Sequence, residues 1–196
     1  MRRHLAASLL MLLAVTLAFG FVYPFVVTGL SQLFFHQQAN GSLIYRNGKL
    51  VGSSLLGQEF TDPKGNPLPR YFQPRPSNAG TGYDGSSSGA SNLGPSNPQL
   101  IKLVAERAIA YRQFNGLPAS APVPVDAVTA SGSGLDPGIS VQNALDQAPR
   151  VARARHLPVT RVTGLVHRYT SGREWGFLGE PAVNVVELNL ALDGHS

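Results

Sequence analysis

The sequence predicts an α+β protein in which one N-terminal transmembrane helix precedes one extracytoplasmic domain of mixed helices and strands. Three observations predict this class. A charge-free apolar run fills residues 5–35, a strong helical pattern fills residues 98–115, and shorter β-type patterns occur on both sides of that helix. We expect a short cytoplasmic N-terminus and the anchor in residues 1–35, followed by one ordinary-sized domain in residues 36–196.

The apolar run is long enough to span a membrane. A helix of about 20 predominantly apolar residues crosses a bilayer, and residues 5–35 contain no Lys, Arg, Asp or Glu. A cleaved secretory signal is the alternative, but its apolar region is usually about 7–15 residues long and ends at a small-x-small site. Arg2 and Arg3 precede the run, which favours a cytoplasmic N-terminus and an extracytoplasmic domain.

Composition bounds the partners that the domain could bind. The 196-residue chain carries 16 basic and 11 acidic side chains and no cysteine, and its net charge is +5. A nucleic-acid interface needs basic residues clustered on one face, whereas here they are spread along the sequence. The excess suits an anionic membrane surface or an acidic partner, and we expect no nucleic acid.

The first part of the domain combines a hairpin with irregular chain. Asn47-Gly48 lies between two apolar runs within residues 43–51, which is a strong hairpin signal because both turn positions need positive φ. Five prolines exclude a regular helix from residues 61–76. The polar, glycine-rich residues 77–98 have the composition of a flexible linker, but a loop of that length inside a domain is either functional or disordered.

A well-marked helix follows this loop. Asn97 suits the N-cap, Pro98 suits the first helical position, and Gly116 suits the C-terminal end. Between them, apolar residues recur at helical spacing. The next expected elements are a short strand at residues 125–129 and a glycine-serine turn at residues 131–138.

The last third of the chain predicts further helices and a final strand. Ser140 caps a helix through about Gln147, and Pro149 begins or kinks a second segment that ends at Arg155. Another helix is expected at about residues 160–169. Alternating apolar residues over 181–192 indicate a half-buried strand, with a bulge where the alternation slips.

Catalytic and metal chemistry is poorly supported. A Ser-His-Asp set could be assembled from Ser133, His167 and Asp136, but the turn lacks the Gly-x-Ser-x-Gly elbow of a hydrolase and the Gly-Lys-Ser/Thr of a P-loop. Its backbone amides form either an anion nest or a plain tight turn. We expect no metal site, because no pair of histidines has a helical ligand spacing. The five histidines are His4, His36, His156, His167 and His195.

Three arginines lie close together in the second proposed helical segment, which follows Pro149. Arg150, Arg153 and Arg155 fall near one another on a helical turn. Guanidinium groups in this pattern bind a carboxylate-bearing partner or a phosphate, or they form an ordinary solvated face.

Several long motifs together resemble the C subunit of the Kdp potassium-transporting ATPase. Their order and spacing match that family over essentially the whole chain, including the N-terminal membrane helix. The motifs are RPS (Arg75–Ser77), SNLGPSNP (Ser91–Pro98), PVDAVTASGSGLDP (Pro124–Pro137), RVARAR (Arg150–Arg155) and VNVVELN (Val183–Asn189).

The resemblance implies a non-catalytic accessory subunit of a high-affinity, ATP-driven potassium uptake complex in the bacterial inner membrane. Its partners would be a channel-like, potassium-translocating subunit, a P-type ATPase subunit and a small membrane subunit. The family member assists assembly and acts as a catalytic chaperone that raises the ATP affinity of the ATPase subunit. We expect no firmly bound cofactor, with ATP reached only through the ATPase subunit.

By the same resemblance, Gln147 and Arg150 are the candidates for the ATP-linked role. An extracytoplasmic domain cannot reach cytoplasmic ATP, so either the topology or direct contact with ATP must be given up, and the anchor favours the topology. The physical alternative is that polar loops dock on the outer mouth of the channel-like subunit. The candidate docking residues are Ser77, Asn92, Asn97, Ser131, Ser133, Asp136 and Arg153.

A different class of function stays open from the residues alone. An independent membrane-anchored hydrolase or binding protein would use the glycine-serine loop as its site. Such a protein would be active without partners, whereas an accessory subunit would co-purify with two large membrane proteins.

Overall fold

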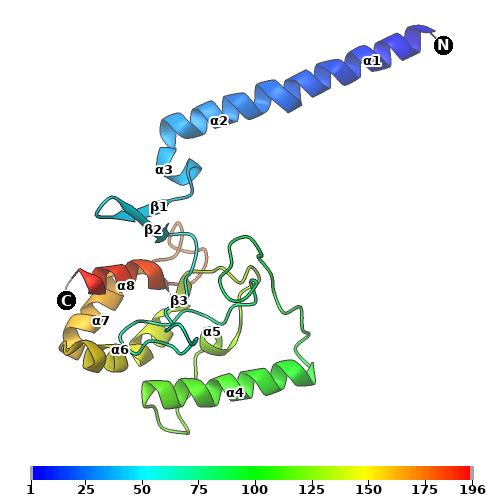
Figure 1. Ribbon diagram of the computed structural model, residues 1–196. Helices are drawn as coiled ribbons and strands as arrows, with labels where there is room; N and C mark the ends of the chain where they lie inside the picture. The colour runs from blue at the N-terminus through cyan, green and yellow to red at the C-terminus, as the bar shows by residue number, and fades with distance from the viewer. Residues whose placement is uncertain (1, 195–196) are drawn as a thin grey trace. The chain divides into compact units, whose positions relative to one another are not determined.

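The computed structural model describes residues 2–194, which divide into two units between Leu43 and Ile44. The first unit consists of a long helix and one short helix, and the second is a domain of helices and short strands (Figure 1). This architecture confirms the α+β class that the sequence predicts, with a candidate membrane span at its N-terminus.

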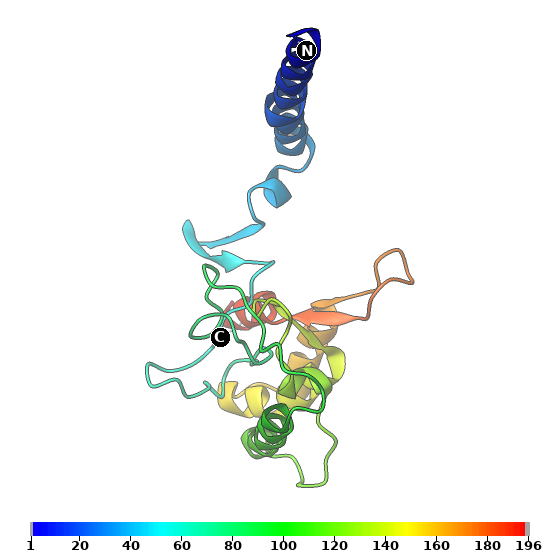
Figure 2. The same ribbon diagram turned by 90° about the vertical axis from the view of Figure 1, so that its right-hand side faces the viewer.

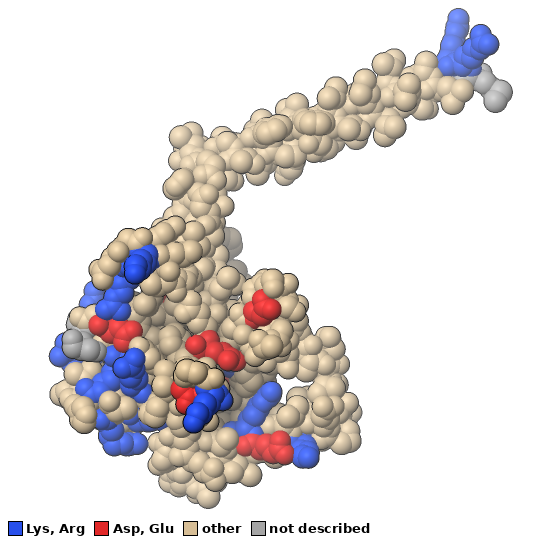
Figure 3. All heavy atoms as spheres, in the orientation of Figure 1, with Lys and Arg blue, Asp and Glu red and all other residues tan. Residues whose placement is uncertain are grey.

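One continuous helix runs from Arg2 to Phe34. Its most apolar window has a mean hydropathy of 2.4, so its length and composition suit a membrane span. Figure 3 shows Lys and Arg side chains at the N-terminal end of this helix and none farther along the visible face. The helix comprises α1 (Arg2–Leu17), the π-helical turn η1 (Ala18–Val22) and α2 (Tyr23–Phe34), and α3 (His36–Ala39) follows it.

The π-helical turn lies directly before Pro24. The N–H of Tyr23 bonds to the carbonyl of Ala18, five residues back, which widens the helix at this point. Proline has no N–H, and its ring crowds the preceding turn of a helix. The widened turn therefore lets the helix pass through the proline without a break.

The second unit begins with the expected hairpin. Strands β1 (Leu43–Arg46) and β2 (Lys49–Ser53) pair with each other, and Asn47 (φ 51°) and Gly48 (φ 75°) form the turn. Both turn residues have the positive φ that Asn-Gly tolerates.

Residues 54–97 form no helix and only isolated bridges, which confirms the absence of a helix that the prolines predict for residues 61–76. The polar part of this segment is nevertheless bonded to the rest of the domain. The Ser77 hydroxyl donates to the carbonyl of Gly134 at 2.7 Å, and the Ser88 hydroxyl donates to that of Ser133 at 2.9 Å. Residues 77–98 therefore have the composition of a linker but form loops that are hydrogen-bonded to the turn at residues 131–138.

Helix α4 (Pro98–Asn115) begins and ends where the sequence predicts. Asn97 Oδ1 accepts a hydrogen bond from the Gln99 N–H at 2.8 Å, and Gly116 ends the helix with a φ of 69°. The caps satisfy backbone groups that have no partner inside the helix.

The strand expected at residues 125–129 is wrong, because this segment forms the helical turn α5 (Val125–Val128). The hydroxyl of Thr129 donates to the carbonyl of Val125 at 2.7 Å and closes the turn. Asp126 in that turn accepts hydrogen bonds from the backbone N–H and hydroxyl of Ser140, both at 2.8 Å. These local contacts outweigh the β propensity of two valines.

The expectation that Pro149 begins a second helical segment is wrong. Helix α6 (Val141–Arg155) is continuous, with Pro149 inside it, and α7 (Val159–Arg168) packs against it. A proline removes one helical hydrogen bond, but Ala148, Val151 and Ala152 around it are fully buried. Burial of this face therefore offsets the cost of the proline.

The strand expected over residues 181–192 is correct only for its first part. Strand β5 (Ala182–Asn184) lies between β3 (Gly138–Ser140) and β4 (Thr170–Ser171) in an antiparallel sheet, and α8 (Val185–Asp193) follows at once. Val185, Leu188, Asn189 and Leu192 are buried at helical spacing. The side chain of Asn184 caps this helix, so the supposed bulge is a strand-to-helix junction.

The core of the domain lies between the sheet and helices α6, α7 and α8. Helix α7 packs against α6 and α8, and both of these contact β5. The fully buried members of the core are Phe72, Ala144, Ala148, Val151, Ala152, Val162, Val166, Val183, Val185, Leu188 and Leu192.

Candidate docking site

Two amide side chains hold the proline-rich segment of residues 61–76 against the helices. Gln147 Oε1 accepts from the backbone N–H of Gln73 at 2.7 Å, and its Nε2 donates to the carbonyl of Gln73 at 3.0 Å. Asn189 makes the same pair of bonds to the backbone of Phe72, both at 2.9 Å. Each amide satisfies both backbone groups of one residue, as a neighbouring strand would.

Arg150 holds the same segment from a second direction. Its guanidinium donates to the carbonyls of Pro69 and Tyr71, to Asn115 Oδ1 and to Gln147 Oε1. It also lies 4.2 Å from the centre of the Phe114 ring. The residue is 4% exposed, and burial lowers the pKa of its guanidinium to about 10. Carbonyl and amide oxygens, with one aromatic ring, therefore stabilise this buried charge.

A ladder of polar side chains extends along one face of α6. Asn143, Gln147 and Arg150 are four and three residues apart, which places them on the same side of a helix. Gln147 Nε2 donates to Asn143 Oδ1 at 2.9 Å, and the Tyr111 hydroxyl donates to the same oxygen at 3.0 Å. Burial raises the pKa of Tyr111, and the nearby carboxylates of Asp146 and Asp126 act in the same direction.

An open groove of about 320 Å³ lies along this ladder. Helix α4 forms one side, and the segment from Gln73 to Ser77 contributes another part of the lining. Arg107, Tyr111 and Phe114 are spaced along one face of α4 and line the groove. The helical spacing of these residues predicts that they share one face of α4. It does not predict that this face borders an open groove, because that depends on which other segments cover the helix.

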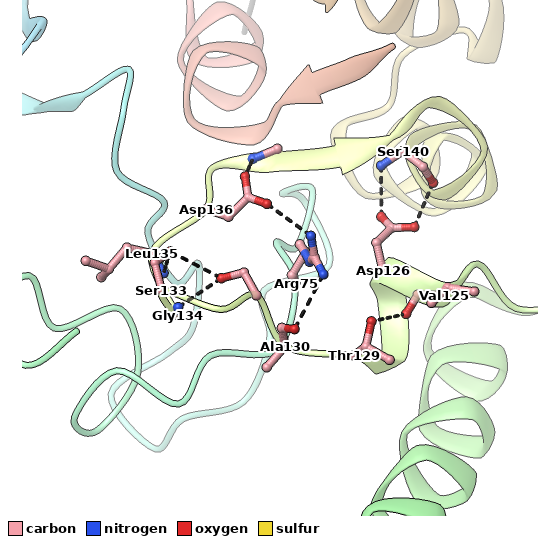
Figure 4. A network of polar contacts seen from close by, with 12 residues as sticks. Arg75, Val125, Asp126, Thr129, Ala130, Ser133, Gly134, Leu135, Asp136 and Ser140 are labelled. Atoms are coloured by element: carbon pink, nitrogen blue, oxygen red, sulfur yellow. Dashed lines mark hydrogen bonds and ion pairs between the residues drawn. The ribbon is translucent and has the colours of Figure 1, made fainter. Parts of the chain in front are cut away.

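Arg75 joins this groove to a second polar network. Its guanidinium forms an ion pair of 3.0 Å with Asp136 and donates to the carbonyl of Ala130 at 3.4 Å (Figure 4). Asp136 also accepts from the Gly138 N–H at 2.8 Å. Arg75 Nε is buried without an acceptor among the residues that the structure describes.

Four of the predicted docking residues, Ser77, Ser131, Ser133 and Asp136, meet in this network. The hydroxyl of Ser131 accepts from the Gly134 N–H at 2.9 Å, and that of Ser133 accepts from the Leu135 N–H at 3.1 Å. Besides its bond to Gly134, Ser77 accepts from the N–H groups of Ala79 and Tyr83. These side chains therefore shape the loops from within.

Tyr83 ties the two loops together. Its hydroxyl donates to the carbonyl of Arg75 at 2.9 Å and lies 3.3 Å from that of Asp136. Burial raises the pKa of the Tyr83 phenol, and the charge of Asp136 raises it further. The phenol is therefore kept in its neutral, donating form.

The other predicted site residues lie apart from this network. Asn97 caps α4, Asn92 is exposed with a φ of 53°, and Arg153 is exposed on α6. Arg155 pairs with Asp193 at 2.7 Å. The three arginines of the 150–155 segment thus do not share one face: Arg150 is buried and Arg153 is exposed.

The chemistry considered from sequence has no assembled site among residues 2–194. No cluster of three or more metal-ligating side chains occurs there, and His195 lies outside the described residues. His167 is exposed on α7, and Ser133 and Asp136 bond to the backbone and to Arg75. In this described part of the chain, these three residues form no hydrogen-bonded triad.

Comparisons with known proteins identify one family. Residues 5–194 match the family model described as "KdpC: K+-transporting ATPase, c chain". A protein of Mycobacterium tuberculosis (strain ATCC 25618 / H37Rv), named potassium-transporting ATPase KdpC subunit, is 57% identical over 98% of this chain and 99% of its own length. Proteins with the same name are similar at 52% identity in Rhodospirillum rubrum, over 98% of this chain and 96% of the relative, and at 48% identity in Koribacter versatilis, over 99% and 96%.

The family match at residues 5–194 includes nearly all of the N-terminal apolar helix as well as the domain that carries the motifs. The chain belongs to the family of KdpC subunits of the potassium-transporting ATPase.

Proposed function

We propose that this chain is a non-catalytic accessory subunit whose domain lies outside the cytoplasm and docks on the channel-like subunit of its complex. The groove beside α4 is the observation that carries this proposal. It is open, while Asn143, Gln147 and Tyr111 in its lining are engaged in hydrogen bonds within the domain. An exposed, largely apolar groove rimmed by polar groups is a kind of surface that marks protein–protein contact sites.

The residues that flank the anchor support this topology. Arg2 and Arg3 are the only Lys or Arg residues before Arg46, and they favour a cytoplasmic N-terminus. The domain would then lie on the outer side of the inner membrane. The anchor itself would pack against helices of the ATPase, channel-like or small membrane subunit, where Gly20 and Gly29 allow close approach.

The effect on ATP affinity would be indirect. Gln147 and Arg150 are 2% and 4% exposed, and both hold the proline-rich segment in place. Substitutions there would change the docking surface first. A better-docked accessory subunit would stabilise the nucleotide-competent state of the ATPase subunit, which is a coupling between two distinct sites.

The experiment compares two identical substitutions on α4. Ala110 and Ala105 are both exposed, but only Ala110 lines the groove. We expect Ala110→Arg to lower recovery of the two large subunits after mild-detergent extraction, along with potassium uptake, and Ala105→Arg to leave both unchanged. Equal recovery for the two variants would exclude docking through the groove. Recovery of the unmodified chain without large membrane partners would contradict the accessory role itself.

A further inference from the structure

The loop between β4 and β5 carries the most exposed aromatic side chain of the described domain. Trp175 is 84% exposed, Phe177 67% and Leu178 46%. Three large apolar side chains at one hairpin tip form a patch of the kind that marks a contact surface. The sequence analysis did not single out this loop.

The loop is built to hold these side chains outward. The backbone N–H of Glu174 bonds to the carbonyl of Leu178, and the reverse bond also forms, both at 2.9 Å. Trp175 has a φ of 50° and Gly176 a φ of 83°. Positive φ is uncommon for a bulky residue, and such strain tends to occur at functional sites.

The charges of the loop leave its tip apolar. Arg173 and Glu180 form an ion pair of 2.7 Å at the base of the hairpin. Glu174 is the remaining charged residue of this hairpin. Beyond it, the tip carries only Trp175, Gly176, Phe177 and Leu178 before the next glycine.

The position of the loop in the domain bears on which surface it contacts. In both views the loop, drawn in orange in Figure 2, lies at about the height of β1 and β2, whereas α4 lies at the opposite end (Figures 1 and 2). In Figure 2 the loop projects to the side of the domain away from β1 and β2. The chain enters the domain at β1. Residues 35–42 separate β1 from the apolar helix and span no more than about 30 Å, so the chain keeps β1 within that reach of the end of the helix.

We infer that Trp175, Phe177 and Leu178 insert into the headgroup region of the membrane that holds the anchor helix. Tryptophan and other aromatic residues favour this depth, because their rings are apolar and the indole N–H finds polar partners there. The loop gives the domain a second membrane contact besides the anchor. This inference rests on the anchor and not on the accessory role.

The chain offers a direct reporter, because Trp175 is its single tryptophan. The full chain is reconstituted in phosphatidylethanolamine–phosphatidylglycerol vesicles whose acyl chains carry bromine either near the headgroup or near the chain end. We expect shallow bromines to quench the emission of Trp175 more than deep ones. Phe177→Ser/Leu178→Ser keeps the reporter and should reduce this quenching and shift the emission to longer wavelengths.

A relocated tryptophan provides the matched control. Ile109 is 55% exposed on α4, at the opposite end of the domain, so Trp175→Phe/Ile109→Trp should show no quenching by lipid bromines. Quenching of Trp175 no stronger than that of this control would overturn the inference. In the assembled complex, a photoreactive benzoylphenylalanine at position 175 that crosslinks to another subunit and not to lipid would overturn it in favour of a protein surface.

Discussion

The side-chain amide of Asn189 exchanges two hydrogen bonds of 2.9 Å with the backbone of Phe72, 117 residues earlier in the chain. Gln147 does the same to the adjacent Gln73. The two amides, from α8 and α6, fix a proline-rich segment that has no sheet partner of its own. They thereby position the chain that continues into Arg75 and the groove.

Removing one of these amides should destabilise the domain strongly. Asn189→Ala leaves a buried N–H and a buried carbonyl of Phe72 without partners, and we expect the free energy of unfolding to fall by about 2–4 kcal/mol. Urea denaturation of the full chain in detergent measures it. The exposed Gln113→Ala on α4 is the control and should change stability by less than about 0.5 kcal/mol. A loss of that small size for Asn189→Ala would show that the amide does not hold the segment.

A pair of glycines tests how closely the loops pack. A Cβ on Gly134, which has a φ of 70°, would lie 2.7 Å from the carbonyl oxygen of Gly89 and 2.8 Å from the backbone nitrogen of Ala79. We expect Gly134→Ala to cost more than about 1 kcal/mol of stability. Gly132→Ala, in the same turn, meets nothing within 4 Å and should be nearly neutral. Similar melting temperatures for the two variants would contradict this packing.

Alkaline pH should weaken the domain through its buried phenols. Burial raises the pKa values of Tyr83 and Tyr111, so the folded state keeps two protons that the unfolded chain releases near pH ~10. Stability from these groups is complete below that pH and falls as pH rises above it. Arg150 changes stability in the opposite direction, because its pKa in the folded domain, about 10, lies below the ordinary arginine value. It is one group, whereas two tyrosines act in the destabilising direction.

The measurement is the free energy of unfolding across about pH 9 to 11, which brackets the ordinary tyrosine pKa. Tyr83→Phe removes one of the two phenols, so the decline should be shallower than in the unmodified chain. A decline of unchanged slope would mean that Tyr83 titrates normally.

The elements that the sequence predicted correctly are those with local signals. Asn97, Pro98 and Gly116 mark the limits of α4, and Asn47-Gly48 marks the hairpin. The errors arose where a local pattern was short or mixed. Val183 and Val185 alternate as in a strand, but Asn184 between them caps a helix, and burial from Val185 onward follows helical spacing.

The sequence predicted the candidate site only in part. The motif residues Ser77, Ser133 and Asp136 do converge, yet their bonds run to backbone groups within the loops. Gln147 reaches Gln73 across 74 residues, and no periodicity encodes such a pairing. The buried state of Arg150 was equally hidden, because a helical turn of arginines usually indicates a solvated face.

We propose that Gln147 acts by holding the domain together and not by touching nucleotide. The most direct test measures the KM for ATP of the purified complex carrying Gln147→Ala or Asn189→Ala. Both substitutions remove an amide that holds the proline-rich segment of residues 61–76. The family resemblance links Gln147, but not Asn189, to ATP. We expect both substitutions to raise the KM by a similar factor and excess unmodified chain to restore it. A KM raised by Gln147→Ala and unchanged by Asn189→Ala would contradict it.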